Sequence, residues 1–414
     1  MAREMKDSGI EWIGTIPDNW QIGRIGHLYT ERKEKVSDTE YTPLSVTMKG
    51  VLPQLSTAAK TDAHDDRKLV RKGDFAINSR SDRRGSCGIS PYDGSVSLIN
   101  TILMPRSEMN PGYYNWLFHS TMFSDEFYKW GHGIVDDLWT TNWQDMKKIS
   151  VPIPSQEEQE RISNYLNTEC ARIDTVMEQT RVSIEEYKKL KQAVITQAVT
   201  KGIRPNRSMK DSGVEWIGDI PKDWKCIKFK YIASVKSNLV SPEGYGDYPQ
   251  ISPENIEKGT GRLLPYKTVS EVGIISGNHL FFKGQILYSK IRPILNKVIV
   301  APFDGLCSAD MYPIETKIEK YFLLYSLRAD SFLANIRLLT EDRVKMPKIN
   351  QEELAEIFFA IPPDDEQHVI VSYLDKKSLE IDTLLRQKEE LLDELESYKK
   401  SLIYEYVTGK KEVI

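Results

Sequence analysis

The chain has 414 residues, enough for two or three domains with cores of their own. Hydrophobic residues make up 40% and charged residues 28%, the usual balance of a soluble globular protein. No apolar run reaches the length of a membrane span, the first residues are too polar for a signal peptide, and the four cysteines form no CxxC pair. We therefore expect a cytoplasmic protein with reduced thiols, and we expect no membrane partner.

Charge is distributed unevenly along the chain. The net charge of −4 argues against a strong nucleic-acid binder that acts alone. Residues 225–350 nevertheless carry 18 Lys/Arg against 12 Asp/Glu, whereas 361–414 carry 8 against 13 and 21–150 carry 17 against 16. If the chain binds DNA, this charge distribution predicts that a partner contributes to strong binding.

The N-terminal segment returns in the middle of the chain. Met5–Trp20 and Met209–Trp224 are identical at 12 of 16 positions. A shorter echo joins Ile173-Asp174-Thr175 to Ile381-Asp382-Thr383, and Val199-Thr200 to Val407-Thr408. A period of about 200 residues is far too long for a solenoid repeat. We infer two copies of one module, each with a head, a variable body and a long helix.

Both bodies are predicted to mix strands and helices. Short apolar runs between turn residues predict strands, and aromatic residues at helical spacing predict a helix in each body. The predicted strands are Tyr41–Val46, Asp74–Asn78, Ser97–Met104, Gln285–Ser289 and Lys297–Val300, and the predicted helices are Tyr113–Trp130 and Lys320–Arg337. Lys72–Ser79 corresponds to Lys283–Ser289, because each runs from a Gly turn into an apolar strand with a basic loop behind it.

Each body is followed by a long stretch that predicts a helix. Proline-rich runs precede Ser155 and Asp364. Each of these two residues is followed three positions later by Glu158 or Gln367, the spacing of a capping box at the start of a helix. No Pro or Gly interrupts the next 46 residues of the first stretch or 45 of the second. Each would form a helix of about 65–70 Å. Such a length in a soluble chain is typical of a coiled coil or a bundle.

Apolar positions in both stretches recur at alternating spacings of three and four. The predicted helix seam comprises Ile173, Met177, Ile184, Tyr187, Val194, Ile381, Leu384, Leu391, Leu395, Tyr398 and Leu402. Lys191 and Lys388 fall at seam positions, so neither seam is perfect. The simplest arrangement is that the two helices cover each other. The alternative is that each packs on its own body.

No catalytic constellation is visible. The chain lacks a phosphate-binding P-loop, a dinucleotide fingerprint, and the Asn/Asp-Pro-Pro-aromatic motif of amino-methyltransferases. The six histidines are scattered, and His132 in its polar loop is far more typical of a surface imidazole than of a metal ligand. Glu186-Tyr-Lys188 has nuclease-like spacing but lies inside a predicted helix, where it forms a solvated face. We predict neither catalytic nor metal-binding residues, and no cofactor held by this chain.

A binding repertoire is visible instead. Two basic loops follow equivalent predicted strands, and Arg, Lys, Asn and Ser are residue types that contact base edges and phosphates. The candidate DNA-binding residues are Asn78, Ser79, Arg80, Arg83 and Arg84 in the first body and Lys290, Arg292, Asn296 and Lys297 in the second. The alternative is that these are solvated loop charges. Trp139 and Trp143 are candidates for base stacking, although such pairs more often anchor a helix to a core.

The pattern resembles the specificity subunits of type I restriction–modification systems. The resemblance is carried by the paired heads, by the Pro/Glu/Gln starts of the long helices at Pro152–Gln159 and Pro362–Gln367, and by the order body, helix, body, helix. It implies an α+β fold with internal pseudo-twofold duplication, in which two target-recognition domains are separated by a pair of long antiparallel coiled-coil helices. The expected divisions are 1–152 and 205–360 for the recognition domains with their heads, and 153–204 and 361–414 for the helices.

The resemblance also implies a division of labour. Each recognition domain would read one half of a bipartite, asymmetric site in double-stranded DNA. The helices would set the spacer and dock two methyltransferase subunits that use S-adenosylmethionine, and restriction subunits that use ATP and Mg would join them. The chain itself would not be an enzyme. The alternatives are a nuclease with an unrecognised site and a coiled-coil adaptor without a DNA role.

Overall fold

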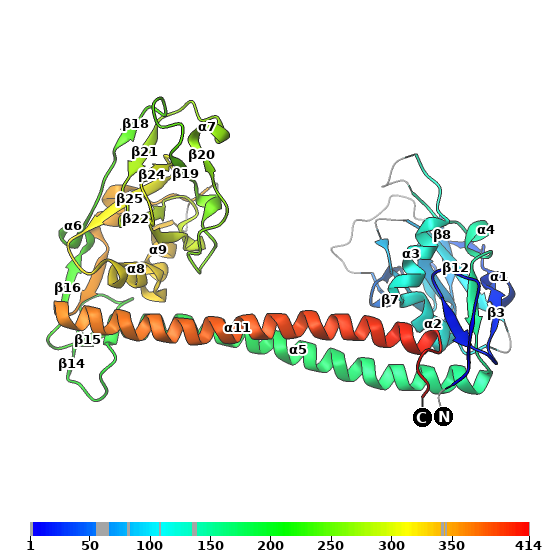
Figure 1. Ribbon diagram of the computed structural model, residues 1–414. Helices are drawn as coiled ribbons and strands as arrows, with labels where there is room; N and C mark the ends of the chain where they lie inside the picture. Colours follow the sequence, from blue (N-terminus) through cyan, green and yellow to red (C-terminus); the bar gives the residue numbers. More distant parts are fainter. Residues whose placement is uncertain are drawn as a thin grey trace. The chain divides into compact units, whose positions relative to one another are not determined.

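The computed structural model describes residues 3–54, 66–80, 83–106, 109–134, 139–340, 343 and 346–413. The chain divides into unit 1 (residues 1–180 and 390–414) and unit 2 (residues 181–389). Each unit contains one mixed body and part of both long helices, α5 (Gln156–Lys201) and α11 (Asp364–Val407) (Figure 1). The predicted α+β class with two long helices is confirmed. Among the described helices, none is long and apolar enough to cross a membrane.

The body of unit 1 is built on a four-stranded antiparallel sheet in the order β10-β9-β12-β4. Its strands are β4 (Tyr29–Glu31), β9 (Phe75–Asn78), β10 (Cys87–Ile89) and β12 (Asn100–Pro105). A second sheet, β11-β8-β5, and the hairpin β6–β7 add β5 (Lys35–Val36), β6 (Leu44–Thr47), β7 (Gly50–Pro53), β8 (Arg67–Val70) and β11 (Gly94–Ser97). The helices are α1 (Ile25–Leu28), α2 (Pro111–His119), α3 (Thr121–Lys129) and α4 (Trp143–Met146).

The body of unit 2 repeats the main sheet in the order β23-β22-β25-β17. Its strands are β17 (Ala233–Val235), β22 (Ile286–Ser289), β23 (Val298–Val300) and β25 (Met311–Thr316). The second sheet has five strands, β18 (Leu239–Val240), β21 (Asn278–Phe281), β24 (Gly305–Cys307), β19 (Pro249–Ile251) and β20 (Lys267–Thr268). The helices are α6 (Phe229–Ile232), η3 (Pro253–Asn255), α7 (Val269–Val272), η4 (Pro293–Leu295), α8 (Lys320–Arg328), α9 (Asp330–Thr340) and α10 (Gln351–Glu356). The bodies therefore share one sheet and differ in what is added to it.

The helix predicted over Tyr113–Trp130 is two helices, α2 and α3, that meet at Ser120. Ser120 has extended backbone angles, and its side chain accepts a hydrogen bond from the Phe123 amide, so it caps α3 while it ends α2. Unit 2 breaks in the same way at Ala329, between α8 and α9. The helical spacing of aromatic residues continues through the break, so the sequence predicted one helix where the structure has two.

Each repeated head forms a small hairpin, β1 (Met5–Asp7) with β2 (Thr15–Pro17) and β14 (Met209–Asp211) with β15 (Asp219–Pro221). Gly9 and Gly213 turn these hairpins with φ near +70°, a conformation that favours glycine. The strand behind each head pairs with the strand that leads into a long helix. These pairs are β3 (Gln21–Arg24) with β13 (Ser150–Ile153), and β16 (Lys225–Lys228) with β26 (Phe358–Ile361). Head, body and helix start are thus tied together in both units.

Both long helices contribute to the hydrophobic core of each unit. In unit 1, Leu166 and Ile173 of α5 and Leu402 of α11 join the core formed by the head and α2. In unit 2, Ile195 of α5 and Leu374 of α11 do the same with the second head and α8. The helices are therefore parts of the two folded units.

The helix segments run antiparallel within each unit. In unit 1, the rings of Tyr165 and Tyr406 lie 4.5 Å apart, and Lys399 Nζ lies 2.6 Å from Asp174 Oδ1. In unit 2, Lys191 Nζ lies 2.7 Å from Asp382 Oδ1. The two ion pairs are copies of one another, because Asp382 and Lys399 each follow their counterpart by 208 residues.

One line of the predicted seam on α11 is corrected. Leu384, Leu391 and Tyr398 are 39%, 40% and 54% exposed, while Leu385 and Leu392 are partly buried. In the observed register, which the ion pairs accompany, the second leucine of each Leu-Leu pair faces inward. Of the other predicted seam residues, the structure buries Ile173, Met177, Ile184, Ile381 and Leu402 and partly buries Tyr187, Val194 and Leu395. Lys388 lies with its Nζ 5.5 Å from the Tyr187 ring centre.

Candidate nucleic-acid interface

The basic loop of unit 1 begins where β9 ends. Asn78 is buried, and its side-chain oxygen accepts a hydrogen bond of 3.0 Å from the Arg80 amide. The Ser79 hydroxyl is buried against the Thr101 hydroxyl at 2.9 Å. Arg80 is the first exposed residue, and its backbone bridges to Thr140. Asn78 and Ser79 therefore fix the chain at the end of β9, while Arg80 faces solvent.

The rest of this loop carries two more exposed arginines, Arg83 and Arg84. The Arg84 guanidinium lies 3.8 Å from the Tyr128 ring centre and 3.3 Å from Asp125 Oδ1. Both members of this ion pair are about half exposed, so the pair contributes little to stability. Arg84 is thus oriented by an aromatic face and remains accessible to an anion.

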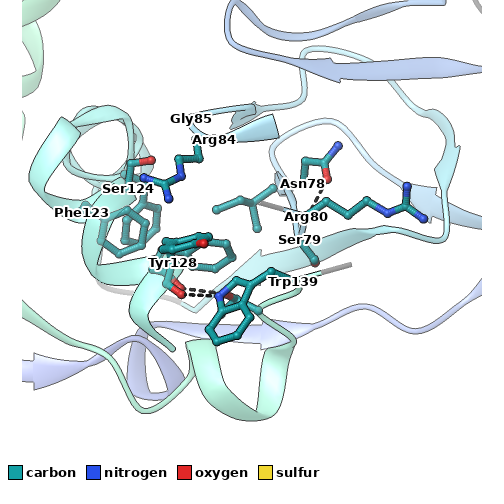
Figure 2. A pocket seen from close by; sticks show the side chains of 13 residues that line it. Asn78, Ser79, Arg80, Arg84, Gly85, Phe123, Ser124, Tyr128 and Trp139 are labelled. Carbon is teal, nitrogen blue, oxygen red and sulfur yellow. Dashed lines mark hydrogen bonds between the residues drawn. The ribbon is translucent and has the colours of Figure 1, made fainter. Parts of the chain in front are cut away.

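A pocket opens between this loop and α3 (Figure 2). Its enclosed part is small, with a volume of about 20 Å³, and the rest of the hollow lies open to solvent. The floor is aromatic and apolar, and the rim carries Arg80, Arg84 and small polar side chains. The lining residues are Ile77, Asn78, Ser79, Arg80, Arg84, Gly85, Phe118, Phe123, Ser124, Phe127, Tyr128, Trp139 and Thr141.

Sequence analysis did not identify Tyr128, and it favoured a core role over base stacking for both Trp139 and Trp143. In the structure, Trp139 is partly exposed and lines the pocket, and its Nε1 donates to the Tyr128 carbonyl at 2.9 Å. Trp143 packs against the hydrophobic core instead. The signal that could have found Tyr128 is its place on the exposed side of an aromatic helix, four residues after Ser124.

The basic loop of unit 2 is folded back more tightly. Lys290 Nζ lies 5.3 Å from the Tyr312 ring centre, and Lys297 Nζ donates to the Pro253 carbonyl at 2.7 Å. Asn296 is buried, and its Nδ2 donates to the Arg328 carbonyl at 3.2 Å. Arg292 is exposed and has a φ of +44°, a left-handed conformation that is rare outside glycine. Of the charged residues in this loop, Arg292 is exposed, whereas Lys290 and Lys297 are partly buried.

Outside the basic loops, we find no cluster of ionisable side chains arranged for catalysis or metal binding among the residues that the structure describes. No group of three or more His, Cys, Asp or Glu is placed to hold a metal ion there. His132 lies 3.4 Å from Asp145, which also pairs with Lys148 at 3.2 Å. Burial raises the pKa of the Cys87 and Cys170 thiols, so both favour the unreactive protonated form.

The repeated frame contains one cluster twice. In unit 1, Glu158 near the start of α5 accepts a 3.0 Å hydrogen bond from Trp20 Nε1 and forms an ion pair with Arg3. In unit 2, Glu366 accepts a 3.1 Å bond from Trp224 Nε1 and pairs with Arg207. The neighbouring glutamines, Gln159 and Gln367, each donate to a proline carbonyl five residues earlier at 3.0 Å. The Glu-Gln pair thus fixes each helix start to its head.

Comparison with known proteins agrees with this architecture. Residues 221–394 match the family of type I restriction modification DNA specificity domains. The specificity subunit of the type I restriction enzyme EcoDI from Escherichia coli is 34% identical over 281 residues, which span 64% of this chain and 63% of that protein. The MjaVIII specificity subunit from Methanocaldococcus jannaschii is 25% identical over 425 residues, or 95% of this chain and 93% of that protein.

Solved structures share the fold. A chain from a study of complex assembly and conformational transition of the type I R-M system superposes with a TM-score of 0.74 at 15% identity, covering 96% of this chain and 99% of that one. The HsdS subunit from Thermoanaerobacter tengcongensis gives 0.54 at 17% identity, covering 96% and 98%. Together with the duplicated heads and the twin long helices, these matches show that the chain is similar in sequence to type I restriction–modification DNA specificity subunits and shares their fold, and that residues 221–394 match the specificity domain itself.

Proposed function

We propose that the chain is the non-catalytic DNA-recognition subunit of a type I restriction–modification complex, and that each body reads one half of a bipartite site. The observation that carries this proposal is the recurrence of an exposed basic loop behind equivalent strands, β9 and β22, in bodies that otherwise differ. Arg80, Arg83 and Arg84 in one loop and Arg292 in the other are exposed. Arginine is the side chain best suited to bidentate contacts with guanine or phosphate.

The frame is proposed to dock two copies of a methyltransferase subunit. Met5-Lys6-Asp7 and Met209-Lys210-Asp211 have the same sequence, and every one of these residues is exposed. An exposed surface repeated in two modules suits two copies of one partner. Leu384, Leu391 and Tyr398, exposed at intervals of seven residues on α11, offer a further apolar stripe to a partner helix.

We assign the methylation and cleavage reactions to the partner subunits. In this proposal S-adenosylmethionine is bound by the methyltransferase subunits, and ATP and Mg by restriction subunits that join the complex. Two alternatives make other predictions. A nuclease would cut DNA when the purified chain is given a metal ion. A plain adaptor would assemble with the methyltransferase without conferring any sequence preference on it.

The test is a set of variants assayed for methylation by the complex with its methyltransferase. Arg80→Ala, Arg83→Ala and Arg84→Ala are expected to weaken recognition of one half-site, and Arg292→Ala recognition of the other. Loss of a base contact should relax one position at a cost of about 1–3 kcal/mol, while loss of a phosphate contact should weaken all sequences and reduce the salt slope by about one. Lys297→Ala, whose ammonium bonds to Pro253, should have a smaller effect. Wild-type specificity in all four arginine variants would exclude these loops as readers.

A further inference from the structure

Each body carries a hairpin at an equivalent place in its fold, outside the basic loops. In unit 1, Pro43 bridges in parallel to Ser95 of β11, and the chain then enters the hairpin β6–β7. In unit 2, β19 pairs in parallel with β24, and the chain then passes through η3 into a hairpin closed by a bridge between Ile256 and Leu263. β11 and β24 are counterparts, because each pairs with the strand that precedes β9 or β22 in the chain. The two hairpins are therefore counterparts as well.

Both hairpins lie close against the edge strand of the main sheet, which is β10 in unit 1 and β23 in unit 2. A Cβ on Gly88 of β10 would lie 2.8 Å from the Cα of Gly50 in the hairpin. A Cβ on Gly261 would collide with the carbonyl oxygen of Val298 in β23 and with the guanidinium of Arg328. Gly50 and Gly261 also have φ of +99° and +64°. Close backbone approach at glycine thus fixes the position of each hairpin.

The same edge strands connect the hairpins to the basic loops. β10 follows the loop that carries Arg84, and β23 begins directly after Lys297. Lys297 Nζ also donates to the Pro253 carbonyl of η3 at 2.7 Å, just before the hairpin begins. Arg328 Nη2 donates to the Val298 carbonyl at 3.0 Å beneath Gly261. In each body, hairpin and basic loop are therefore neighbouring parts of one structure.

The tip of the hairpin in unit 1 projects away from the core. Met48 is 73% exposed, and Lys49 next to it is exposed as well. The Lys49 amide donates to the Thr47 hydroxyl at 3.1 Å, which stabilises the turn through the backbone and leaves both tip side chains available to a partner.

The tip in unit 2 has different chemistry at the corresponding place. Lys258, Thr260 and Arg262 are exposed, and a Cβ on Gly259 would meet no other atom within 4 Å. The Arg262 amide donates to the Thr260 hydroxyl at 3.1 Å, and the Arg262 guanidinium pairs with Glu257 at 2.7 Å. The Arg262 side chain is nevertheless 70% exposed, so this ion pair is weak and can be exchanged for another acceptor.

We infer that the two hairpin tips enter the major groove of DNA beside the basic loops and contact base edges there. Met48 and Lys49 would read the half-site of unit 1, and Lys258 and Arg262 the half-site of unit 2. The inference rests on the proposed DNA recognition and adds a second reading element to each body. The major groove admits a two-stranded β-ribbon, Lys and Arg bond to guanine O6 and N7, and apolar side chains contact the thymine methyl group. Equivalent hairpins with different tips suit two bodies that read different sequences.

The test uses the full chain in complex with its methyltransferase and a DNA library in which each position of the site is randomised. The site is first identified from the modified bases of host DNA. Lys258→Ala and Arg262→Ala are expected to relax positions in the half-site of unit 2, and Met48→Ala and Lys49→Ala positions in that of unit 1. Each lost base contact should reduce discrimination at one position by about 5- to 150-fold. The other half-site should be read as in the wild type.

Arg262 also allows the groove itself to be tested. Arg262→Lys keeps the charge but loses the planar fork that bonds to guanine, so it should relax the same position as Arg262→Ala. Replacing purines one at a time by 7-deazapurines removes N7 from the major-groove edge. One replacement should weaken binding by the wild type and cause no further loss in Arg262→Ala. Losses that add up at every purine would overturn the groove contact.

The controls remove an exposed lysine from the same bodies. Lys283 precedes β22 and Lys72 precedes β9, at the ends of these strands opposite the basic loops, and both are exposed. Lys283→Ala and Lys72→Ala should keep wild-type specificity at every position. All hairpin variants change exposed side chains, so their urea unfolding midpoints should match that of the wild type.

The outcomes separate this inference from the function on which it rests. Hairpin variants that read both half-sites as the wild type does, or that weaken binding of all sequences equally, would overturn the hairpin inference. DNA recognition would then stand if the arginine variants of the basic loops still lose specificity. Absence of sequence-specific binding by the wild-type complex would overturn both.

Discussion

At the scale of single residues, the carboxylates at the helix starts have the clearest structural task. Glu158 and Glu366 each satisfy a buried tryptophan N–H and an arginine from the preceding head. Loss of either carboxylate leaves a buried donor without a partner, which costs about 1–3 kcal/mol. The head would then be held to its helix mainly by apolar contacts.

We therefore predict that Glu158→Ala and Glu366→Ala each destabilise the unit that carries the change by about 1–3 kcal/mol. Hydrogen exchange followed by mass spectrometry would locate the loss at the head and helix start of that unit. The exposed neighbours Glu157→Ala and Asp365→Ala are matched controls and should stay within about 0.5 kcal/mol of wild type. Equal protection in all four variants would show that the cluster does not anchor the head.

A histidine in unit 1 gives a pH dependence. Burial lowers the pKa of His119 below its usual 6.5, and the ring lies beside Cys87 with Nδ1 2.7 Å from the Asn115 carbonyl. Lys399 also lowers this pKa by charge repulsion. Since the unfolded chain binds the proton more readily, stability is fully present above pH 6.5 and falls as the pH drops below that value.

We predict that urea unfolding of the wild type shows lower stability at pH 5 than at pH 7.5, and that His119→Gln loses part of this difference. His279 in unit 2 also has a lowered pKa because it is buried, so some pH dependence should remain. The exposed His27→Gln is the control and should keep the wild-type slope. An unchanged slope in His119→Gln would mean that this ring is not the group that titrates.

Sequence reasoning located the basic loops but could not determine which of their side chains face outward. Asn78 and Ser79 continue a strand in which every side chain is buried, so alternation gave no guide. Asn296 adopts a left-handed conformation with φ of +51°, and its side chain is buried as a result of long-range packing on Arg328. Tyr128 and Trp139 meet because Thr140 bridges to His132, which brings Trp139 back beside the end of α3.

At the scale of elements, the long helices were predictable in extent but not in phase. Helix α5 begins at Gln156, directly after the predicted cap Ser155, and α11 begins at Asp364. Leu384-Leu385 and Leu391-Leu392 offer two seams one residue apart, and periodicity alone cannot choose between them. The choice is made by packing against the core, where Leu392 and Leu395 lie, and the ion pairs of Asp174 with Lys399 and Lys191 with Asp382 match the resulting register.

This choice gives a prediction with a built-in control. Leu392→Ala should destabilise unit 1 by about 1–2 kcal/mol, because it removes buried apolar area next to the core. Leu391→Ala, one residue earlier and 40% exposed, should change stability by less than about 0.5 kcal/mol. Urea unfolding of both variants would measure this difference. Comparable losses would mean that the α11 seam runs through Leu391 after all.

The same two variants, Leu391→Ala and Leu392→Ala, also test whether the methyltransferase docks on α11. If the exposed stripe of α11 docks the methyltransferase, Leu391→Ala should weaken assembly of the complex while it leaves the chain stable. Analytical ultracentrifugation with purified methyltransferase would compare the two effects in one experiment.

At the scale of the whole molecule, the duplicated chain has a repeated frame and two bodies that differ. Twelve of sixteen head positions are identical, and the Glu-Gln pair at each helix start and the inter-helix ion pairs recur, which suits the proposed docking of two equal partners. The bodies keep one sheet and change the strands, loops and pocket added to it. Sequence comparison within the chain therefore identified the frame easily, while the shape of the candidate DNA-binding loops depended on packing that has no internal repeat.

The frame also makes a prediction about distance. We propose that the helix pair acts as a ruler, so that the unread gap between half-sites depends on helix length. Insertion of one heptad after Glu186 and one after Arg386 preserves the seam, because Tyr187 faces Lys388 and Lys191 faces Asp382 in unit 2. Each helix grows by about 10 Å, and the preferred gap should increase by about three base pairs. Methylation of a library of sites with varied gaps would measure the change.

Three added base pairs also rotate one half-site by about a third of a turn, so activity at the best gap should fall below wild type. An active insertion variant that still prefers the original gap would refute the ruler, and the spacing would then have to be set by the docked partners.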